Sequence, residues 1–258
     1  MKKLTSILAG ALFAAISLNS CDSVSEPDRF VPAEIIPQRA VLIEEYTGQL
    51  CTNCPDGHAA IKDILTTLGD SVVPVSIHAS NLAINLPLGL KTNTGEEYYK
   101  AAGSPALPTA IINMQTSPLQ VADWGAAINR LIMDKTPFTV AASAKVNGDN
   151  YDIEVAFSSG DDYEGKLMVW ILENDIVRRQ IDHGTNIQNY VHNHVFRAAA
   201  TSDIWGDPVS LKAHEAQHKS ISFPIPANEY WNPDNLYVVA FLYNDSGVQQ
   251  VTSTPQSH

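Results

Sequence analysis

The feature that most constrains the fold is a Cys-x-x-Cys sequence between a predicted strand and a predicted helix. The strand starts with the apolar residues 41–43 and is broken at Gly48, and Cys51 and Cys54 follow directly. The helix is predicted by apolar side chains at positions 61, 64, 65 and 68, which share one helical face. Pro55 is compatible with a first helical turn. The two cysteines are therefore predicted to lie at the N-terminus of a helix.

This position favours redox chemistry at the cysteine pair. A helix N-terminus carries partial positive charge and free N–H groups, which stabilise a thiolate and lower its pKa. We expect Cys51 to be exposed and nucleophilic, and Cys54 to be shielded and to resolve a mixed disulfide. Asp56 follows the pair and opposes thiolate formation. We therefore expect only a modest lowering of the Cys51 pKa.

The N-terminus predicts export and lipid attachment. A short basic start precedes an apolar stretch over residues 7–18, which is too short to span a bilayer and is typical of a secretory signal. The sequence Leu-Asn-Ser ahead of Cys21 resembles a bacterial lipobox. We expect residues 1–20 to be removed, Cys21 to carry lipid, and the proline-containing residues 21–38 to form a tether. The remaining two cysteines then meet an oxidising compartment.

Charge and composition exclude several classes of protein. The 258 residues contain 16 Lys and Arg against 28 Asp and Glu, a net charge of -12. Such an acidic chain repels phosphate backbones, so we expect no nucleic-acid partner. Hydrophobic residues make up 45% of the chain, which excludes wholesale disorder. No second apolar stretch approaches membrane-spanning length, so the predicted membrane association is through the lipid anchor.

The rest of the first half predicts an α/β domain over residues 39–135. A second strand is predicted at 72–77 and a third at 108–112, with a helical pattern over 121–133. A polar, Asn-rich insertion at 80–95 is expected to lie near the cysteines and to cover them.

The second half, residues 136–258, is predicted to be all-β. Asn147-Gly148-Asp149-Asn150 is a strong hairpin turn, and the residues after it alternate between apolar and polar. About seven short strands separated by turns suggest an immunoglobulin-like sandwich. They are predicted at 138–146, 151–157, 167–172, 192–198, 219–225, 236–243 and 248–252.

The first half resembles the thioredoxin fold. Strand, Cys-x-x-Cys, helix, strand and then Leu107-Pro108-Thr109 leading into a strand match its order. The resemblance implies a cis-proline at Pro108 beside the cysteine pair. It also implies that Glu45, six residues before Cys51, is the buried acid that helps to deprotonate the resolving cysteine.

The whole chain resembles the Omp28-related outer-membrane lipoproteins of Bacteroidetes. The resemblance rests on the lipobox, on Glu44-Glu45-Tyr46-Thr47-Gly48 with the following Cys-x-x-Cys-Pro, and on Tyr190-Val191-His192-Asn193-His194. It implies a thioredoxin-like domain joined to a β-rich domain in an outer-membrane lipoprotein of the cell envelope. The resemblance thus implies a fold and a location.

Two alternatives compete for the cysteine pair. A zinc site would have to be completed by His58 or His78, whereas structural zinc sites usually take two spaced cysteine or histidine pairs. A static structural disulfide is the stronger alternative, although so short a loop gains little stability from chain entropy.

Two further groups of histidines are alternative candidates for a metal site. His192 and His194 alternate as on one face of a strand, with His183 nearby. His214 and His218 satisfy the H-E-x-x-H pattern, but their segment lacks an apolar helical face. We assign no metal and no cofactor. The predicted function is thiol–disulfide exchange with exported proteins or an envelope redox partner. The alternative is a surface binding or structural lipoprotein with a catalytically idle thioredoxin-like domain.

Overall fold

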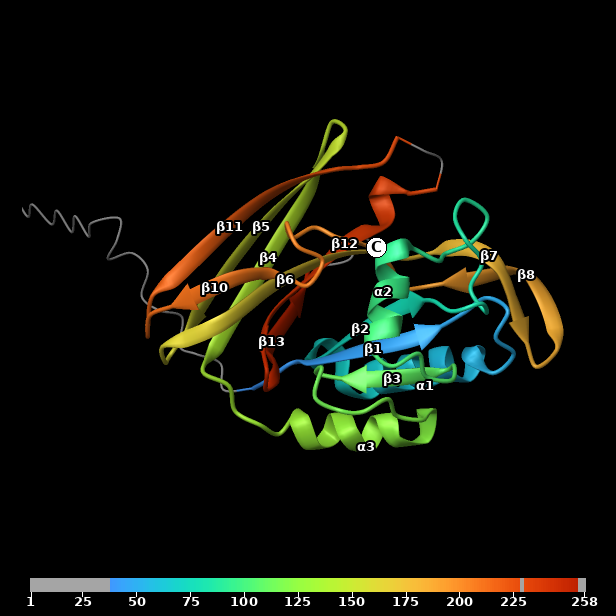
Figure 1. Ribbon diagram of the computed structural model, residues 1–258, viewed down its shortest axis with the longest axis horizontal. Coiled ribbons are helices and arrows are strands. Elements are labelled where there is room, and N and C mark those ends of the chain that lie inside the picture. Colours follow the sequence, from blue (N-terminus) through green and yellow to red (C-terminus); the bar gives the residue numbers. More distant parts are fainter. Residues whose placement is uncertain (1–37, 228–229, 255–258) are drawn as a thin grey trace, which may run out of the picture. The chain divides into compact units, whose positions relative to one another are not determined.

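The computed structural model describes residues 38–227 and 230–254 (Figure 1). The predicted signal peptide, Cys21 and all but the last residue of the predicted tether lie outside the described residues. The elements of the first half are β1 (Val41–Thr47), α1 (Cys54–Leu68), η2 (Gly69–Ser71), β2 (Val72–His78), α2 (Asn93–Ala101), β3 (Thr109–Ile112) and α3 (Val121–Leu131).

The elements around the cysteines follow from local sequence. The run Val41–Thr47 is buried along its whole length because helices cover both faces of this part of the sheet. Helix α1 has Pro55 in its first turn, and Gly69 follows its last residue with a φ of 53° that favours glycine. Strand β1 pairs with β2 in parallel and with β3 antiparallel.

The second half is built from β-strands, as predicted. The hairpin turn at Gly148 joins the first two of them. In the described residues the elements are β4 (Phe138–Asn147), β5 (Asn150–Ser159), β6 (Tyr163–Glu173), β7 (Ile176–Asp182), β8 (Thr185–His192), β9 (Val195–Ala199), β10 (Asp207–Leu211), β11 (Ala216–Pro224), η3 (Pro233–Asn235), β12 (Leu236–Asn244) and β13 (Gly247–Ser253).

One sheet contains strands from both halves of the chain. Its order is β13-β12-β6-β9-β2-β1-β3, and β10 pairs with β6. The junction is at Ser76, whose backbone N–H donates to the His194 carbonyl oxygen at 2.7 Å and which pairs with Val195. Residues on each side of the predicted boundary at 135/136 therefore share a mixed, predominantly β architecture. Strands β11-β5-β4 form a second sheet and β7-β8 a separate hairpin.

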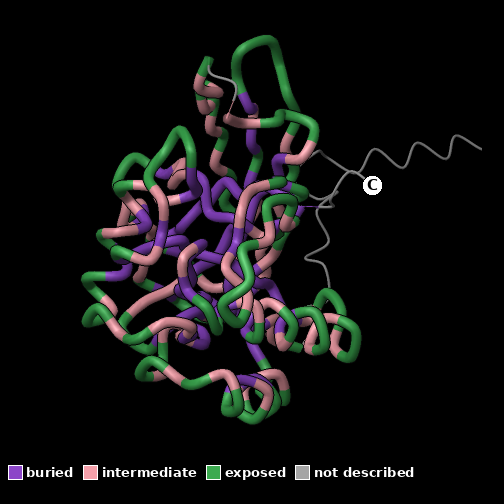
Figure 2. Tube along the Cα trace, turned by 90° about the vertical axis from the view of Figure 1, so that its right-hand side faces the viewer, coloured by how far each residue is buried: buried purple, intermediate pink, exposed green. Residues whose placement is uncertain are grey.

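Three large apolar cores and one small cluster (Leu90, Ile176 and Val195) lie among the described residues. Figure 2 shows the buried segments gathered in the interior with exposed loops around them. Helices α1 and α3 cover one face of the large sheet, where Ile61, Trp124 and Ile128 pack. Helix α2 covers the other face with Tyr98. The β4-β5-β11 sheet packs on β6 and β12 through a third core.

One strand prediction needs correction, and three strands were not predicted. The strand predicted at 192–198 starts only at Val195, because His192 ends β8 and pairs with Ile176. Strands β7 and β8 were not predicted because their residues do not alternate regularly between apolar and polar. The strand β10 was also missed, since it is short and contains Pro208.

Candidate functional site

Cys51 and Cys54 form a disulfide at the N-terminus of α1, with their Cα atoms 5.4 Å apart. Cys51 precedes the helix and Cys54 is its first residue. Their side chains are buried, with exposed fractions of 4% for Cys51 and 0% for Cys54. The expectation of an exposed Cys51 is therefore wrong for this oxidised state, and the reason is that other segments of the chain cover the turn.

The β7–β8 hairpin covers the turn from one side. The buried side-chain amide of Gln180 donates to the carbonyl oxygens of Cys51 at 3.0 Å and Gly48 at 3.2 Å. At the tip of the hairpin, the backbone N–H of His183 donates to the Thr52 carbonyl at 2.9 Å. Among the described residues, six hydrogen bonds join this hairpin to residues 48–52. The other three run from Ile181 N to Gln49 O (2.8 Å), from Gly184 N to Thr52 Oγ1 (2.9 Å) and from Gln49 Nε2 to Arg179 O (3.4 Å).

The insertion predicted to cover the site does so from another side. The backbone N–H of Leu50 donates to the Leu82 carbonyl at 2.8 Å, and Leu90 N donates to Gln49 Oε1 at 3.0 Å. A Cβ atom placed on Gly48 would come within 2.6 Å of the Leu82 carbonyl oxygen. Glycine is therefore required where the turn before the disulfide meets the insertion.

The thioredoxin resemblance implies roles for Pro108 and Glu45, and both residues lie beside the first turns of α1. The Leu107–Pro108 bond is cis, as expected. A Cβ atom added to Gly57 would lie 2.7 Å from Glu45 Oε1, 3.0 Å from Trp124 and 3.4 Å from Pro108 Cβ. Gly57, three residues after Cys54, thus lets the helix approach both side chains.

Glu45 is fully buried on the face of the sheet that α1 covers. Ser76 Oγ donates to Glu45 Oε2 at 2.7 Å, and His58 Nε2 lies 3.6 Å from Glu45 Oε1. Burial raises the pKa of this carboxyl because the charged form loses its hydration, while His58 and the Ser76 hydroxyl act in the opposite direction. Glu45 therefore holds a proton more readily than an exposed glutamate does.

Glu44 lies on the opposite face of the same strand, among tyrosines. Burial raises its pKa to about 8. The sequence analysis quoted Glu44 only as part of a motif and assigned it no role. The signal in the sequence is that two adjacent carboxylates lie within an otherwise apolar strand. Successive side chains of a strand point to opposite faces, so one carboxylate must be buried on each face of the sheet.

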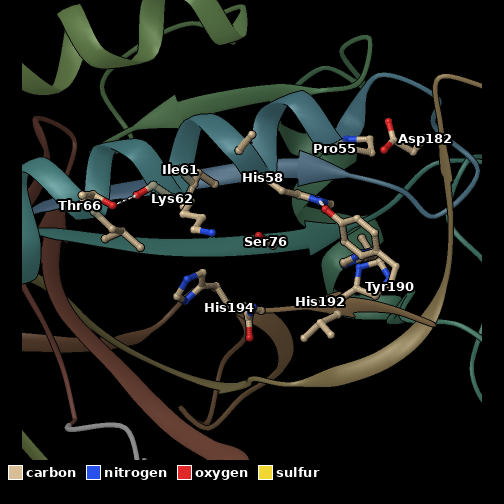
Figure 3. A pocket seen from close by; sticks show the side chains of 15 residues that line it. Pro55, His58, Ile61, Lys62, Thr66, Ser76, Asp182, Tyr190, His192 and His194 are labelled. Atoms are coloured by element: carbon tan, nitrogen blue, oxygen red, sulfur yellow. Dashed lines mark hydrogen bonds between the residues drawn. The ribbon is translucent and has the colours of Figure 1, made fainter. Parts of the chain in front are cut away.

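His58 connects the buried acid to a cavity. Its Nε2 lies 3.0 Å from Thr47 Oγ1 and its Nδ1 lies 2.7 Å from the hydroxyl of Tyr190 on β8. Figure 3 shows the His58 and Tyr190 side chains directed toward each other at one end of the cavity. The cavity has a volume of about 770 Å³ and is also lined by Ser76 and His192.

The other imidazoles of this cavity are neutral at neutral pH. Burial lowers the pKa of His192 to about 3 and that of His194 to about 4, and it lowers the pKa of His78 well below the usual value. No three His, Cys, Asp or Glu side chains of residues 38–227 and 230–254 stand in an arrangement that holds a metal ion. His58 and His78 line the cavity, and the cysteines they were considered to complement are joined to each other.

The remaining histidine alternatives do not form the predicted groupings. His183 lies at the hairpin tip beside Asp182 and Asp56, and His192 lies at the other end of β8. These two acids raise the pKa of His183. His214 lies in a turn with a φ of 64° and His218 lies in β11, so the H-E-x-x-H pattern is not on a helix.

Comparisons with known proteins support one family. The family model described as outer membrane protein Omp28 matches residues 93–256. No curated protein matches the chain. The matched region includes Pro108 and the β7–β8 hairpin but not Cys51 and Cys54, so the match itself says nothing about the cysteine pair.

Two solved structures share the fold at low sequence identity, and a third is similar over part of the chain. HBP35 of Porphyromonas gingivalis is 17% identical with a TM-score of 0.69, over 84% of this chain and 75% of that one. The protein AGR_C_4864 from Agrobacterium tumefaciens is 19% identical with a TM-score of 0.52, over 86% of this chain and 99% of that one. A domain of the outer membrane lipoprotein Omp28 from Porphyromonas gingivalis is 17% identical, with a TM-score of 0.33 over 46% of this chain and 87% of that one.

Proposed function

The chain belongs to the outer membrane protein Omp28 family, and from that premise we propose that its Cys51–Cys54 pair exchanges disulfides with exported proteins. The family assigns the chain to the outer membrane of the cell envelope. In the part of the chain that the structure describes, no helix is both long enough and apolar enough to cross a membrane.

One observation carries the proposal: the disulfide, the cis-proline and the buried acid meet at the first two turns of one helix. The helix N-terminus stabilises the Cys51 thiolate in the reduced protein. Glu45 is buried against Gly57, where a carboxylate is suited to take the proton of the resolving Cys54. A static cross-link needs neither the acid nor the proline.

The reaction runs in two steps. The Cys51 thiolate attacks one sulfur of a substrate disulfide, a mixed disulfide forms, and the other substrate sulfur leaves as a thiolate. Cys54 then attacks the Cys51 sulfur, the protein disulfide forms, and the substrate leaves as a second thiolate. The protein loses two electrons and the substrate gains them; a dithiol reductant of the envelope restores the protein, and the reverse sequence oxidises a substrate dithiol.

The order of elements supports a thioredoxin-like arrangement for this part of the fold. Strands β1 and β2 are parallel and joined by α1, while β3 follows the cis-proline and runs antiparallel to β1. Helices α1 and α3 share one face of the sheet. The packing of β4-β5-β11 on β6 and β12 supports an immunoglobulin-like sandwich that continues into the same large sheet.

The burial of Cys51 favours a second candidate function. A disulfide under a hairpin and an insertion is also what a binding or structural lipoprotein with an idle thioredoxin-like domain would have. In the exchange proposal, the hairpin must move away from residues 48–52 before a substrate sulfur reaches Cys51.

Substrate trapping tests the proposal against this second candidate. The wild-type protein should reduce insulin with dithiothreitol as the reductant, and Cys51→Ser should be inactive. Cys54→Ser should retain a mixed disulfide with the substrate on a non-reducing gel, since the resolving thiol is gone. If the wild-type protein reduces no insulin and Cys54→Ser traps nothing, the idle candidate is correct.

A further inference from the structure

We propose that His58 carries protons between the buried Glu45 carboxyl and the cavity during exchange at Cys54. The inference rests on the proposed exchange function and adds a residue to it. His58 acts through Glu45, so it is a positioning residue for proton transfer and not a catalytic residue.

The position of His58 on α1 gives it access to the reacting end of the helix. His58 follows Cys54 by four residues, so both side chains project from the same side of the helix. Gly57, between them, is the residue at which Glu45 Oε1 approaches the backbone. The acid therefore lies beside the helical turn that runs from the resolving cysteine to His58.

The hydrogen bonds of Glu45 leave one carboxyl oxygen for His58. Oε2 accepts from Ser76 Oγ at 2.7 Å, whereas Oε1 accepts no hydrogen bond from the described residues. His58 Nε2 lies 3.6 Å from it and 3.0 Å from Thr47 Oγ1. A buried carboxylate oxygen without a hydrogen bond is costly, and a small displacement of the imidazole or one water molecule would satisfy it.

The other ring nitrogen of His58 faces outward. Nδ1 lies 2.7 Å from the Tyr190 hydroxyl, and both side chains line the cavity of about 770 Å³. The His58 side chain is 18% exposed, against 0% for Glu45. An imidazole accepts a proton at one nitrogen and releases one from the other, so His58 connects a sealed acid to solvent.

The resolving step requires proton transfer at the buried Glu45 carboxyl, and His58 provides the path for it. The Cys54 thiol passes its proton to the Glu45 carboxylate, the Cys54 sulfur bonds to Cys51, and the Cys51–substrate bond breaks. The substrate leaves as a thiolate and takes a proton from solvent. Because burial favours the protonated Glu45 carboxyl, its own proton must first leave the buried site through His58 to the cavity, and the proton received from Cys54 later leaves by the same path. Loss of His58 therefore slows the resolving step itself.

Few other groups compete for this proton. The buried imidazoles nearby are neutral, and the two charged groups of the cavity, Lys62 and Asp182, line its wall. The titratable groups that face His58 from the elements packed against it, or that line the same cavity, are Glu45 of β1, His78 of β2, Lys62 of α1 itself, Asp182 of β7, Tyr190 and His192 of β8, and His194 before β9.

The experiment measures the resolving step by single turnover as a function of pH. The reduced protein is mixed with a model disulfide substrate, and release of the second substrate thiol is followed in wild type, His58→Gln, His58→Ala and Tyr190→Phe. His194→Gln removes an imidazole from the same cavity and serves as the matched control. Circular dichroism checks that each variant is folded.

We expect His58→Gln to slow release about 100-fold, within the range for loss of one proton-transfer group, and to displace the pH profile. Imidazole added to His58→Ala should restore the rate, and should restore nothing in Glu45→Gln. Tyr190→Phe, which keeps the ring and loses the hydroxyl, should slow release about 10-fold even if the His58 variants do not fold. His194→Gln should behave as wild type.

Two results overturn the inference and are distinguishable from each other. A wild-type rate and pH profile in His58→Gln, or in Tyr190→Phe where the His58 variants do not fold, refutes the proton path and leaves exchange intact. If the wild-type protein releases no substrate thiol at all, the exchange proposal fails and the proton path fails with it.

Discussion

Gln180→Ala should release the hairpin that covers the disulfide and accelerate its reduction. In the closed structure the Gln180 amide donates to the Cys51 carbonyl at 3.0 Å and the Gly48 carbonyl at 3.2 Å. Each such bond contributes about 1 kcal/mol net, and the two carbonyls still accept from the backbone N–H groups of Cys51 and Cys54, so no unsatisfied acceptor adds to the cost. The closed state should therefore lose about 2 kcal/mol, which raises the open population about 30-fold.

The assay is reduction by dithiothreitol at constant pH, quenched by alkylation and read by mass spectrometry. If local opening precedes reduction, the observed rate of Gln180→Ala should exceed that of wild type by about 30-fold. Val177→Ala, at an exposed position on the same strand β7, is the matched control and should react as wild type.

Hydrogen exchange separates local opening from global destabilisation. Amides at residues 48–52 and 180–184 should lose protection in Gln180→Ala, while those of the buried strand β12 should keep it. An unchanged reduction rate would refute the reasoning that the hairpin limits access. A faster rate accompanied by equal loss of protection in β12 would refute it too, because the whole fold would then be opening.

Three further predictions concern stability and anchoring. Because burial raises the pKa of Glu44 from 4.5 to about 8, the folded state binds a proton at Glu44 more tightly than the unfolded state does. The contribution of this proton to the free energy of unfolding is fully present below pH 4.5 and is lost as the pH rises through 8. Urea unfolding should therefore show Glu44→Gln to be more stable than wild type by about 3 kcal/mol at pH 7 and of similar stability at pH 4, and parallel pH curves would contradict this. Gly57→Ala should lower the free energy of unfolding by about 2 kcal/mol, because its Cβ would lie 2.7 Å from Glu45 Oε1. Gly125→Ala in α3, where a Cβ has open space, should raise the free energy of unfolding by about 1 kcal/mol. Equal effects of the two substitutions would argue against the close approach at Gly57. Cys21→Ser should leave the protein without lipid and free of the membrane fraction, as read by the intact mass of the mature chain, and a lipid-free wild-type N-terminus would contradict the lipobox.

Sequence reasoning located what depends on neighbouring residues. The strand before Cys51, the helix after Cys54 and the turn at Gly148 are each specified by a few consecutive residues, and each lies where expected. The cis bond before Pro108 followed from a resemblance that is itself local in sequence.

The sequence did not reveal contacts between distant segments. Hairpin β7–β8 has a polar sequence around Gln180, and six hydrogen bonds of the described residues join it to residues 48–52, well over 100 positions earlier. Burial of Cys51 follows from those contacts, so an exposed cysteine was the natural but wrong expectation. The approach of His58 to Glu45 likewise depends on how α1 lies over β1.

The reduction potential of the Cys51–Cys54 disulfide tests the central claim most directly. Equilibration of the full-length protein with dithiothreitol buffers of known potential, followed by alkylation, gives the value. An exchange-active pair with Thr-Asn between its cysteines and Asp56 after them should lie between about −270 and −180 mV, the range from thioredoxin to disulfide isomerase. A potential below about −300 mV, typical of structural disulfides, would contradict the account.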